Sequence, residues 1–243
     1  MSPSANSGPL PADMSKRERQ TAQWLIASYQ ALNDHFGNLH WWPGDSPLEI
    51  IVGAILTQNT AWQNVEKAIA NLKAARLLTT DALTAIPESD LAQLLRPSGY
   101  YNVKARRLKS FFIFLQDCFQ GNLDVMLGEK TRTLRKKLLQ VKGIGEETAD
   151  SILLYAGGKP IFVVDAYTRR ILMRHGVIRE RLAYGDIQRL FMKHLAHDAP
   201  LFNQYHALLV NTGKNYCSKT KPRCQACPLN HLDKLQASVI SRQ

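Results

Sequence analysis

The feature that most constrains the fold is the spacing of apolar residues, which repeats at intervals of three and four along most of the chain. This spacing predicts amphipathic helices, because residues three or four apart share a helix face. The strand-like run at residues 160–164 is too short and solitary to build a sheet, so we predict an all-α fold. The expected helices are residues 15–36, 48–56, 62–72, 102–119, 131–140, 146–156, 166–175, 185–197 and 201–211, with two short helices capped by Asp81 and Ser89.

The composition is typical of a globular protein that binds a polyanion. The chain has 243 residues, of which 45% are hydrophobic, enough for one large domain or two modest ones. Its net charge of +11 makes nucleic acid a favoured partner. Residues 1–15 resemble a disordered tail rather than a signal peptide, and no apolar run approaches the roughly 20 residues of a membrane span. We expect a cytoplasmic, nucleoid-associated protein without a membrane partner.

A helix, a Gly-Ile-Gly turn and a second helix follow one another within residues 131–156. Glycines allow unusual backbone angles, and amides at a helix N-terminus suit a phosphate group. The alternative is an ordinary tight turn, but basic residues flank this one, which favours a hairpin that grips DNA. The predicted DNA contacts here are Lys142, Gly143, Gly145 and Thr148.

Asp165 ends an apolar run and opens a predicted helix. It can serve as an N-cap, and the same carboxylate can stabilise a positively charged sugar during cleavage of a glycosidic bond. Further along, Cys217, Cys224 and Cys227 have the spacing C-x6-C-x2-C, while Cys118 stands apart. Such crowding indicates a metal site rather than disulfides in a cytosolic chain.

The hairpin, then Val-Val-Asp, then the cysteine cluster resemble the endonuclease III superfamily of DNA glycosylases, from about residue 24 to residue 233. The resemblance implies a two-lobed helix-hairpin-helix glycosylase fold. A six-helix barrel would cover residues 49–159, and residues 16–48 with 160–243 would form a second, cluster-bearing lobe. It also implies that the partner is duplex DNA with a damaged base, bound in a cleft between the lobes, with Asp165 as the catalytic residue. We expect a monomer, because one DNA site needs only one cleft.

Members that also cut the strand carry a lysine in the hairpin, at the position that Glu147 occupies here. Glutamate cannot form a Schiff base, so the resemblance implies a glycosylase that uses water and has no lyase activity. Glu147 would then either position that water or be a solvated helix residue.

Four segments, residues 41–43, 56–62, 96–105 and 142–150, resemble the 3-methyladenine DNA glycosylase III branch of this superfamily. The branch implies that Trp62 stacks on the flipped base and that Trp41, Trp42 and Pro43 form the opposing wall. An indole face attracts an electron-poor alkylated purine. The alternative is that these tryptophans are core residues.

The superfamily inserts side chains into the duplex at positions matched by Gln58 and Tyr100, to fill the gap left by the flipped nucleotide. Tyr100 could instead be a buried helix cap. Lys104 is expected to contact phosphate, together with its neighbours Arg106 and Arg107.

The cysteine spacing matches the family's [4Fe–4S] loop, but Asp233 stands where the family has its fourth cysteine. We predict Cys217, Cys224, Cys227 and Asp233 as ligands. The open alternatives are a [3Fe–4S] centre, ligation by His231 or Cys118, zinc, or a decayed site. The loop's basic residues, Lys219, Lys221 and Arg223, are expected to face the DNA backbone.

The predicted function is therefore excision of alkylated purines such as 3-methyladenine from DNA. The alternatives are removal of oxidised or mismatched bases, or a non-catalytic role in binding DNA.

Overall fold

The structure, a computed structural model, describes residues 13–41, 44–179 and 182–235. Its regular elements are all helical, and these residues contain no strand, which confirms the all-α prediction. The helices are α1 (Lys16–Phe36), α2 (Pro47–Leu56), α3 (Trp62–Ala74), α4 (Thr80–Ala85), α5 (Glu88–Leu94), η1 (Arg96–Ser98), α6 (Tyr101–Phe119), α7 (Leu123–Gly128), α8 (Thr131–Leu138), α9 (Glu146–Ser151), η2 (Ile152–Ala156), α10 (Ala166–Arg174), α11 (Tyr184–His194), α12 (Ala199–Asn215) and η3 (Cys224–Ala226).

Several predicted helix boundaries were wrong. Thr79 caps α4 in place of Asp81, and α5 begins after Pro87, not after a Ser89 cap. Helix α7, capped by Asn122, was not predicted, since six residues carry too little periodicity. Helix α12 starts earlier than expected because the Asp198 carboxylate accepts a hydrogen bond from Leu201 N at 2.7 Å.

The chain divides into two compact units. Unit 1 comprises residues 1–41 and 160–243, and unit 2 comprises residues 42–159. The first boundary between the units falls after Trp41, whereas the sequence prediction places it after residue 48. Helix α2 contacts α3, α6, α9 and η2, all of unit 2.

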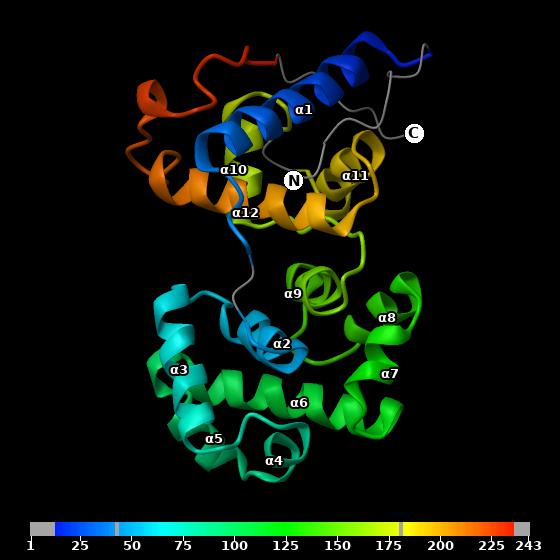
Figure 1. The fold of residues 1–243 in the computed structure, drawn as a ribbon, viewed down its shortest axis with the longest axis vertical. Coiled ribbons are helices and arrows are strands. Elements are labelled where there is room, and N and C mark those ends of the chain that lie inside the picture. Colours follow the sequence, from blue (N-terminus) through cyan, green and yellow to red (C-terminus); the bar gives the residue numbers. More distant parts are fainter. Residues whose placement is uncertain (1–12, 42–43, 180–181, 236–243) are drawn as a thin grey trace. The chain divides into compact units, whose positions relative to one another are not determined.

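Unit 2 is arranged around α6, which contacts α2, α4, α5 and α7 (Figure 1). One face of α6 is buried, through Leu108, Phe111, Phe112 and Leu115. Helix α9 continues directly into the π-helical turn η2, and η2 packs against α2. The predicted helix over residues 146–156 is therefore present, with a change of pitch at Ile152.

Unit 1 contains α1, α10, α11 and α12, with α12 packed against both α1 and α10. Gly213 allows the approach of α10, because a Cβ there would lie 2.2 Å from the Tyr167 ring. The buried run at residues 161–164 is extended but pairs with no strand among the described residues. Its backbone groups bond instead to α11, through Gln188 Nε2 to Phe162 O (2.6 Å) and Val164 N to Tyr184 Oη (3.3 Å). None of the described helices is long and apolar enough to cross a membrane.

Candidate functional site

The hairpin of unit 2 connects α8 to α9. Arg135 on α8 donates to both carboxylate oxygens of Asp150 on α9, at 2.6 and 3.0 Å, and Asp150 is fully buried. Ile144, at the tip, is buried and anchors the turn. A two-bond pair of this kind fixes the angle at which the turn presents its backbone.

The turn itself is exposed. Lys142, Gly143 and Gly145 lie at the surface, as a phosphate-binding turn requires. Gly143 has φ +92°, and a Cβ there would lie 2.4 Å from Arg107 Cγ, so only glycine fits. Thr148 differs from the prediction: it is buried, and its hydroxyl accepts a hydrogen bond from Gln58, so in this conformation it does not reach DNA.

Gln58 lies in the loop after α2, and its side chain is turned toward the hairpin. Its Nε2 donates to Gly143 O (3.0 Å) and to Thr148 Oγ1 (2.8 Å). Its Oε1 accepts from Arg107 on α6. The residue predicted to enter the duplex is thus held by three bonds within unit 2, and insertion would need these bonds to be released.

Tyr100 is the large hydrophobic side chain most exposed among the described residues, at 74%. It occupies the N-cap position of α6 in a left-handed conformation, with φ +46°, directly after Gly99, which has φ +65°. A left-handed tyrosine is uncommon, and such conformations concentrate at functional sites. Its exposure excludes the buried-cap alternative.

Lys104 does not lie at the surface, so the prediction of a direct phosphate contact was wrong. Its side chain is 1% exposed, and its Nζ donates to Thr60 Oγ1 and Ser98 O. It falls on the inner face of α6, four residues before the buried Leu108. Burial, assisted by the charge of Arg107, lowers the pKa of Lys104 to about 8.

Two other predicted pocket residues of unit 2 are accessible. Trp62 begins α3 and is half-buried, with its Nε1 donating to Glu66 Oε1 at 2.7 Å. Glu147 is exposed in the first turn of α9, beside the hairpin. Trp62 is therefore not a fully buried core residue, and the position that carries a lyase lysine in other members presents a carboxylate.

In unit 1, Asp165 is the N-cap of α10. Its Oδ1 accepts a hydrogen bond from Thr168 N at 2.7 Å. Its Oδ2 lies 3.8 Å from Nε2 of His206, which projects from α12 and is buried. Burial lowers the pKa of His206, against an opposing effect of Asp165, so the imidazole is neutral at neutral pH.

Trp41, also in unit 1, is half-buried, with the Lys214 ammonium 5.6 Å from its ring centre. The other two residues of the predicted wall, Trp42 and Pro43, lie outside the described residues.

The cysteine loop is tied to α10 by two arginines. Arg174 donates to Cys217 Sγ (3.1 Å), Ser218 O (2.7 Å) and Lys219 O (3.0 Å), and Arg170 donates to Cys217 O (2.7 Å). Cys217 and Cys227 are buried and Cys224 is exposed. Burial raises the pKa of the Cys227 thiol, and the neighbouring Cys217 and Cys224 thiols add to the effect.

The chemistry of three thiols suits iron–sulfur ligation. However, within residues 13–41, 44–179 and 182–235 no three His, Cys, Asp or Glu side chains are gathered into a ready metal-binding set. Asp233 and His231 are both exposed near the end of this segment, and Cys118 is exposed on α6 of unit 2. The donor chemistry therefore fits three ligands, and the fourth is not assigned.

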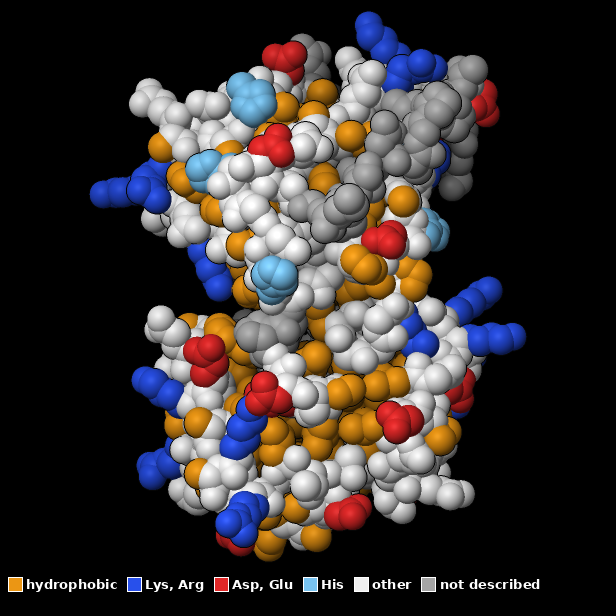
Figure 2. All heavy atoms as spheres, viewed as in Figure 1, with side chains coloured by type: hydrophobic (Ala, Val, Ile, Leu, Met, Phe, Trp, Pro, Cys, Tyr) orange, Lys and Arg blue, Asp and Glu red, His pale blue; other side chains and the backbone are white. Residues whose placement is uncertain are grey.

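Lys219, Lys221 and Arg223 are all exposed on the cysteine loop, and Lys and Arg side chains project from both units (Figure 2). Arg223 is also used internally: its Nε donates to Asn215 O at 3.0 Å, and its guanidinium lies 5.4 Å from the Tyr216 ring centre.

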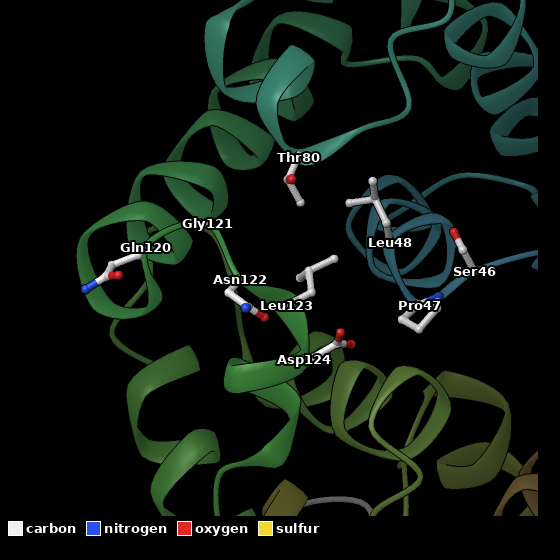
Figure 3. Close-up of a pocket in the computed structure, with 9 residues that line it drawn as sticks. All are labelled: Ser46, Pro47, Leu48, Thr80, Gln120, Gly121, Asn122, Leu123 and Asp124. Atoms are coloured by element: carbon white, nitrogen blue, oxygen red, sulfur yellow. The ribbon is translucent and has the colours of Figure 1, made fainter.

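An open pocket of about 510 Å³ lies elsewhere in unit 2, formed by the starts of α2 and α4 and the turn between α6 and α7 (Figure 3). Asp124 is the only charged residue of its lining, and no predicted site residue reaches it.

Sequence reasoning missed two residues that shape these sites: His206 faces Asp165, and Arg174 holds the cysteine loop. Arg107, expected to contact phosphate, donates instead to Gln58 in this structure. Only helical register offered a signal, since His206 lies among buried positions of α12.

Comparisons with known proteins identify the family of this chain. The sequence model of the family described as "HhH-GPD superfamily base excision DNA repair protein" matches residues 52–197 of this chain. A Methanocaldococcus jannaschii protein named as a candidate DNA repair glycosylase is 46% identical over 209 residues, covering 85% of this chain and 94% of that protein. Endonuclease III of Thermotoga maritima is 29% identical over 188 residues, covering 77% and 83%.

Among solved structures, H. pylori 3-methyladenine DNA glycosylase bound to 1,N6-ethenoadenine is similar with a TM-score of 0.68 and 29% identity, covering 80% of this chain and 97% of that one. A non-covalent endonuclease III–DNA complex has a TM-score of 0.75 at 22% identity, covering 89% and 96%, and shows the same fold. The chain therefore belongs to the HhH-GPD superfamily of base excision DNA repair proteins, and it is a DNA glycosylase of that family.

Proposed function

We propose that this glycosylase removes alkylated purines from duplex DNA by hydrolysis and leaves the strand uncut. The observation that carries the proposal is the exposed Glu147 beside the hairpin turn, where a strand-cutting member needs a lysine amine. A carboxylate cannot attack the sugar to form a Schiff base. The nucleophile must then be water.

The exposed turn supplies the grip on DNA. Backbone amides at Gly143 and Gly145 and the Lys142 ammonium suit a phosphate of the duplex. Such contacts fix the position of the protein without reading sequence, and the net charge of +11 favours association with any duplex. Tyr100 is the side chain best exposed to enter the stack when a nucleotide is turned out.

Asp165 supplies the chemistry. As the N-glycosidic bond breaks, its electron pair leaves with the base and positive charge develops on the sugar. A carboxylate stabilises that charge, then accepts the proton of the water that bonds to the sugar, giving free base and an abasic site. The capping bond from Thr168 N fixes the carboxylate's orientation, and the neutral His206 leaves its negative charge uncancelled.

The choice of alkylated purines is supported by Trp62 and Trp41, whose rings are both partly exposed. Alkylation makes a purine electron-poor, which strengthens its attraction to an indole face. It also weakens the glycosidic bond, so a single carboxylate is sufficient machinery. The similarity to a 3-methyladenine glycosylase supports the same substrate class.

We further propose that Cys217, Cys224 and Cys227 ligate an iron–sulfur cluster, with Asp233 as the fourth ligand. When bound, the cluster would brace the loop that carries Lys219 and Lys221. No step of the reaction depends on it.

The test is a single-turnover assay on labelled duplexes containing 3-methyladenine, 7-methylguanine, hypoxanthine, thymine glycol or a mismatched uracil or thymine, with Asp165→Asn as control. Base loss from methylated purines, with strand breaks only after alkali, supports the proposal. Strand breaks without alkali, together with an enzyme–DNA adduct that borohydride traps, would overturn the hydrolytic mechanism. Base loss confined to thymine glycol or mismatches would overturn the substrate class. Absence of base loss from every duplex would favour a non-catalytic DNA-binding protein.

A further inference from the structure

Lys104 joins two loops of unit 2 that are about 40 residues apart in sequence. Its Nζ donates to Thr60 Oγ1 (2.5 Å) in the loop at residues 57–61, and to Ser98 O (2.6 Å) at the end of η1. Thr60 Oγ1 also lies 2.7 Å from Ser98 O, as a donor. The three groups form a closed triangle, anchored in the first turn of α6.

The two loops joined by Lys104 carry the two residues expected to enter DNA. Gln58 lies two residues before Thr60, and Tyr100 lies two residues after Ser98. Tyr100 and Gly99 both have positive φ, so this strained turn needs external support. The first loop is held in turn on the hairpin, through the bonds of Gln58 to Gly143 O and Thr148 Oγ1.

The chemistry of the joint is unusual for a purely structural contact. Lys104 is almost fully buried, yet its hydrogen-bond partners are a hydroxyl and a carbonyl, with no carboxylate. The one charged group that acts on it is a cation, Arg107; no carboxylate on the helices packed against α6 contributes to its pKa among the described residues. A methionine could fill this space without burying a charge.

We propose that Lys104 is the positioning residue that locks the Gln58 loop and the Tyr100 loop into one element, which enters the duplex as the damaged nucleotide is turned out. This inference rests on the proposed function, because it assumes nucleotide flipping.

Lys109 offers a matched control on the same helix. Its Nζ donates to the carbonyl oxygens of Leu83 (3.3 Å), Thr84 and Ile86 (2.8 Å), at the end of α4. Lys109 joins the end of α4 to α6, much as Lys104 joins two loops. The segment that Lys109 contacts carries no residue predicted to touch DNA. Lys109→Met therefore reproduces the loss of a lysine joint without affecting the Gln58 and Tyr100 loops.

The experiment uses a duplex with a tetrahydrofuran abasic-site analogue beside 2-aminopurine, whose fluorescence rises when it is unstacked. Wild type should raise the fluorescence. Lys104→Met should lose at least fivefold of the rise while binding undamaged duplex within twofold of wild type. Thr60→Val, which removes the Thr60 hydroxyl from the triangle, should lose part of the fluorescence rise. Lys109→Met should give the same rise as wild type.

A pH series separates positioning from simple stability. Because the pKa of Lys104 is about 8, the wild-type rise should weaken between pH 7 and pH 9 as the ammonium loses its proton. Lys104→Arg keeps its charge, so it should restore the rise and make it independent of pH over this range.

Each outcome is decisive. No fluorescence rise with wild type would overturn nucleotide flipping, and the inference with it. A wild-type rise that Lys104→Met fully retains would overturn the inference alone. Equal losses in Lys104→Met and Lys109→Met would show that only general stability is involved, and would also overturn it.

Discussion

Replacing Gly143 with alanine should destabilise the hairpin, whereas the same change at Gly145 should not. Gly143 has φ +92°, and an added Cβ would lie 2.4 Å from Arg107 Cγ and 3.0 Å from Arg107 Cδ. Gly145 has φ −93°, and nothing lies within 4 Å of its added Cβ. The two glycines thus form a matched pair two residues apart in one turn.

The magnitude has two parts. An alanine in a sparsely populated positive-φ conformation costs about 1–3 kcal/mol. Moving the Arg107 stem also loosens its bond to Gln58, and a hydrogen bond to a charged group contributes about 1.5–3 kcal/mol. Gly143→Ala should therefore lower the free energy of unfolding by about 2.5–6 kcal/mol. Gly145→Ala should change it by less than about 1 kcal/mol, in the stabilising direction, because alanine restricts the unfolded chain.

Urea denaturation followed by circular dichroism measures the free energy of unfolding of both variants and of wild type. The m-values are compared to detect any change in the unfolding transition. Salt-dependent binding to undamaged duplex is measured beside it. The argument would be refuted if the two variants were equally stable, since sterics at Gly143 would then not govern the turn.

Three further predictions concern Asp165, His206 and Cys217. Asp165→Asn should slow base release by about 10² to 10³-fold in a single-turnover assay, and unchanged release would remove Asp165 from the chemistry. Burial lowers the pKa of His206 below its ordinary value of about 6.5. As pH falls below 6.5, the imidazole is therefore protonated in the unfolded chain before it is protonated in the folded one. The contribution of His206 to the free energy of unfolding is thus fully present above pH 6.5 and is lost as pH falls below it. His206→Gln should make the loss of stability between pH 7.5 and pH 5.5 shallower in urea denaturation; an identical loss would mean that other groups cause it. Cys217→Ser should abolish the iron content and the visible absorption of the purified protein, whereas zinc recovered from wild type would replace the iron–sulfur proposal.

The helical class could be predicted from the sequence because the apolar periodicity of this chain is strong and continuous. The short elements could not. Helix α7 spans six residues, too few for periodicity, and the caps of α4 and α5 depend on which of several neighbouring polar residues begins the turn. Tertiary contacts decide that choice, and the sequence does not display them.

The glycine of the turn could be predicted because few residue types suit its conformation. Gly143 has φ +92°, and an added Cβ would meet the Arg107 side chain, so glycine is required there. Lys104 was misassigned because a lysine in a basic segment was read as a surface cation. Lys104 shares a helix face with Leu108 and Phe111, and this register places it on the inner face of α6. Here the register is a better guide to burial than the charge of the side chain.

Asp165 shows why a structural role and the catalytic role that we propose need not compete. An N-cap requires a carboxylate oxygen that accepts a backbone N–H, and Oδ1 fills that role with Thr168. The second oxygen, Oδ2, is not used by the cap and lies 3.8 Å from His206 Nε2, too far for a direct hydrogen bond. Capping therefore fixes one oxygen and the helix N-terminus favours negative charge, while the other oxygen stays available to stabilise a cationic sugar. The same contact that begins α10 would orient the carboxylate for the proposed reaction, which is why sequence alone could not separate the two roles.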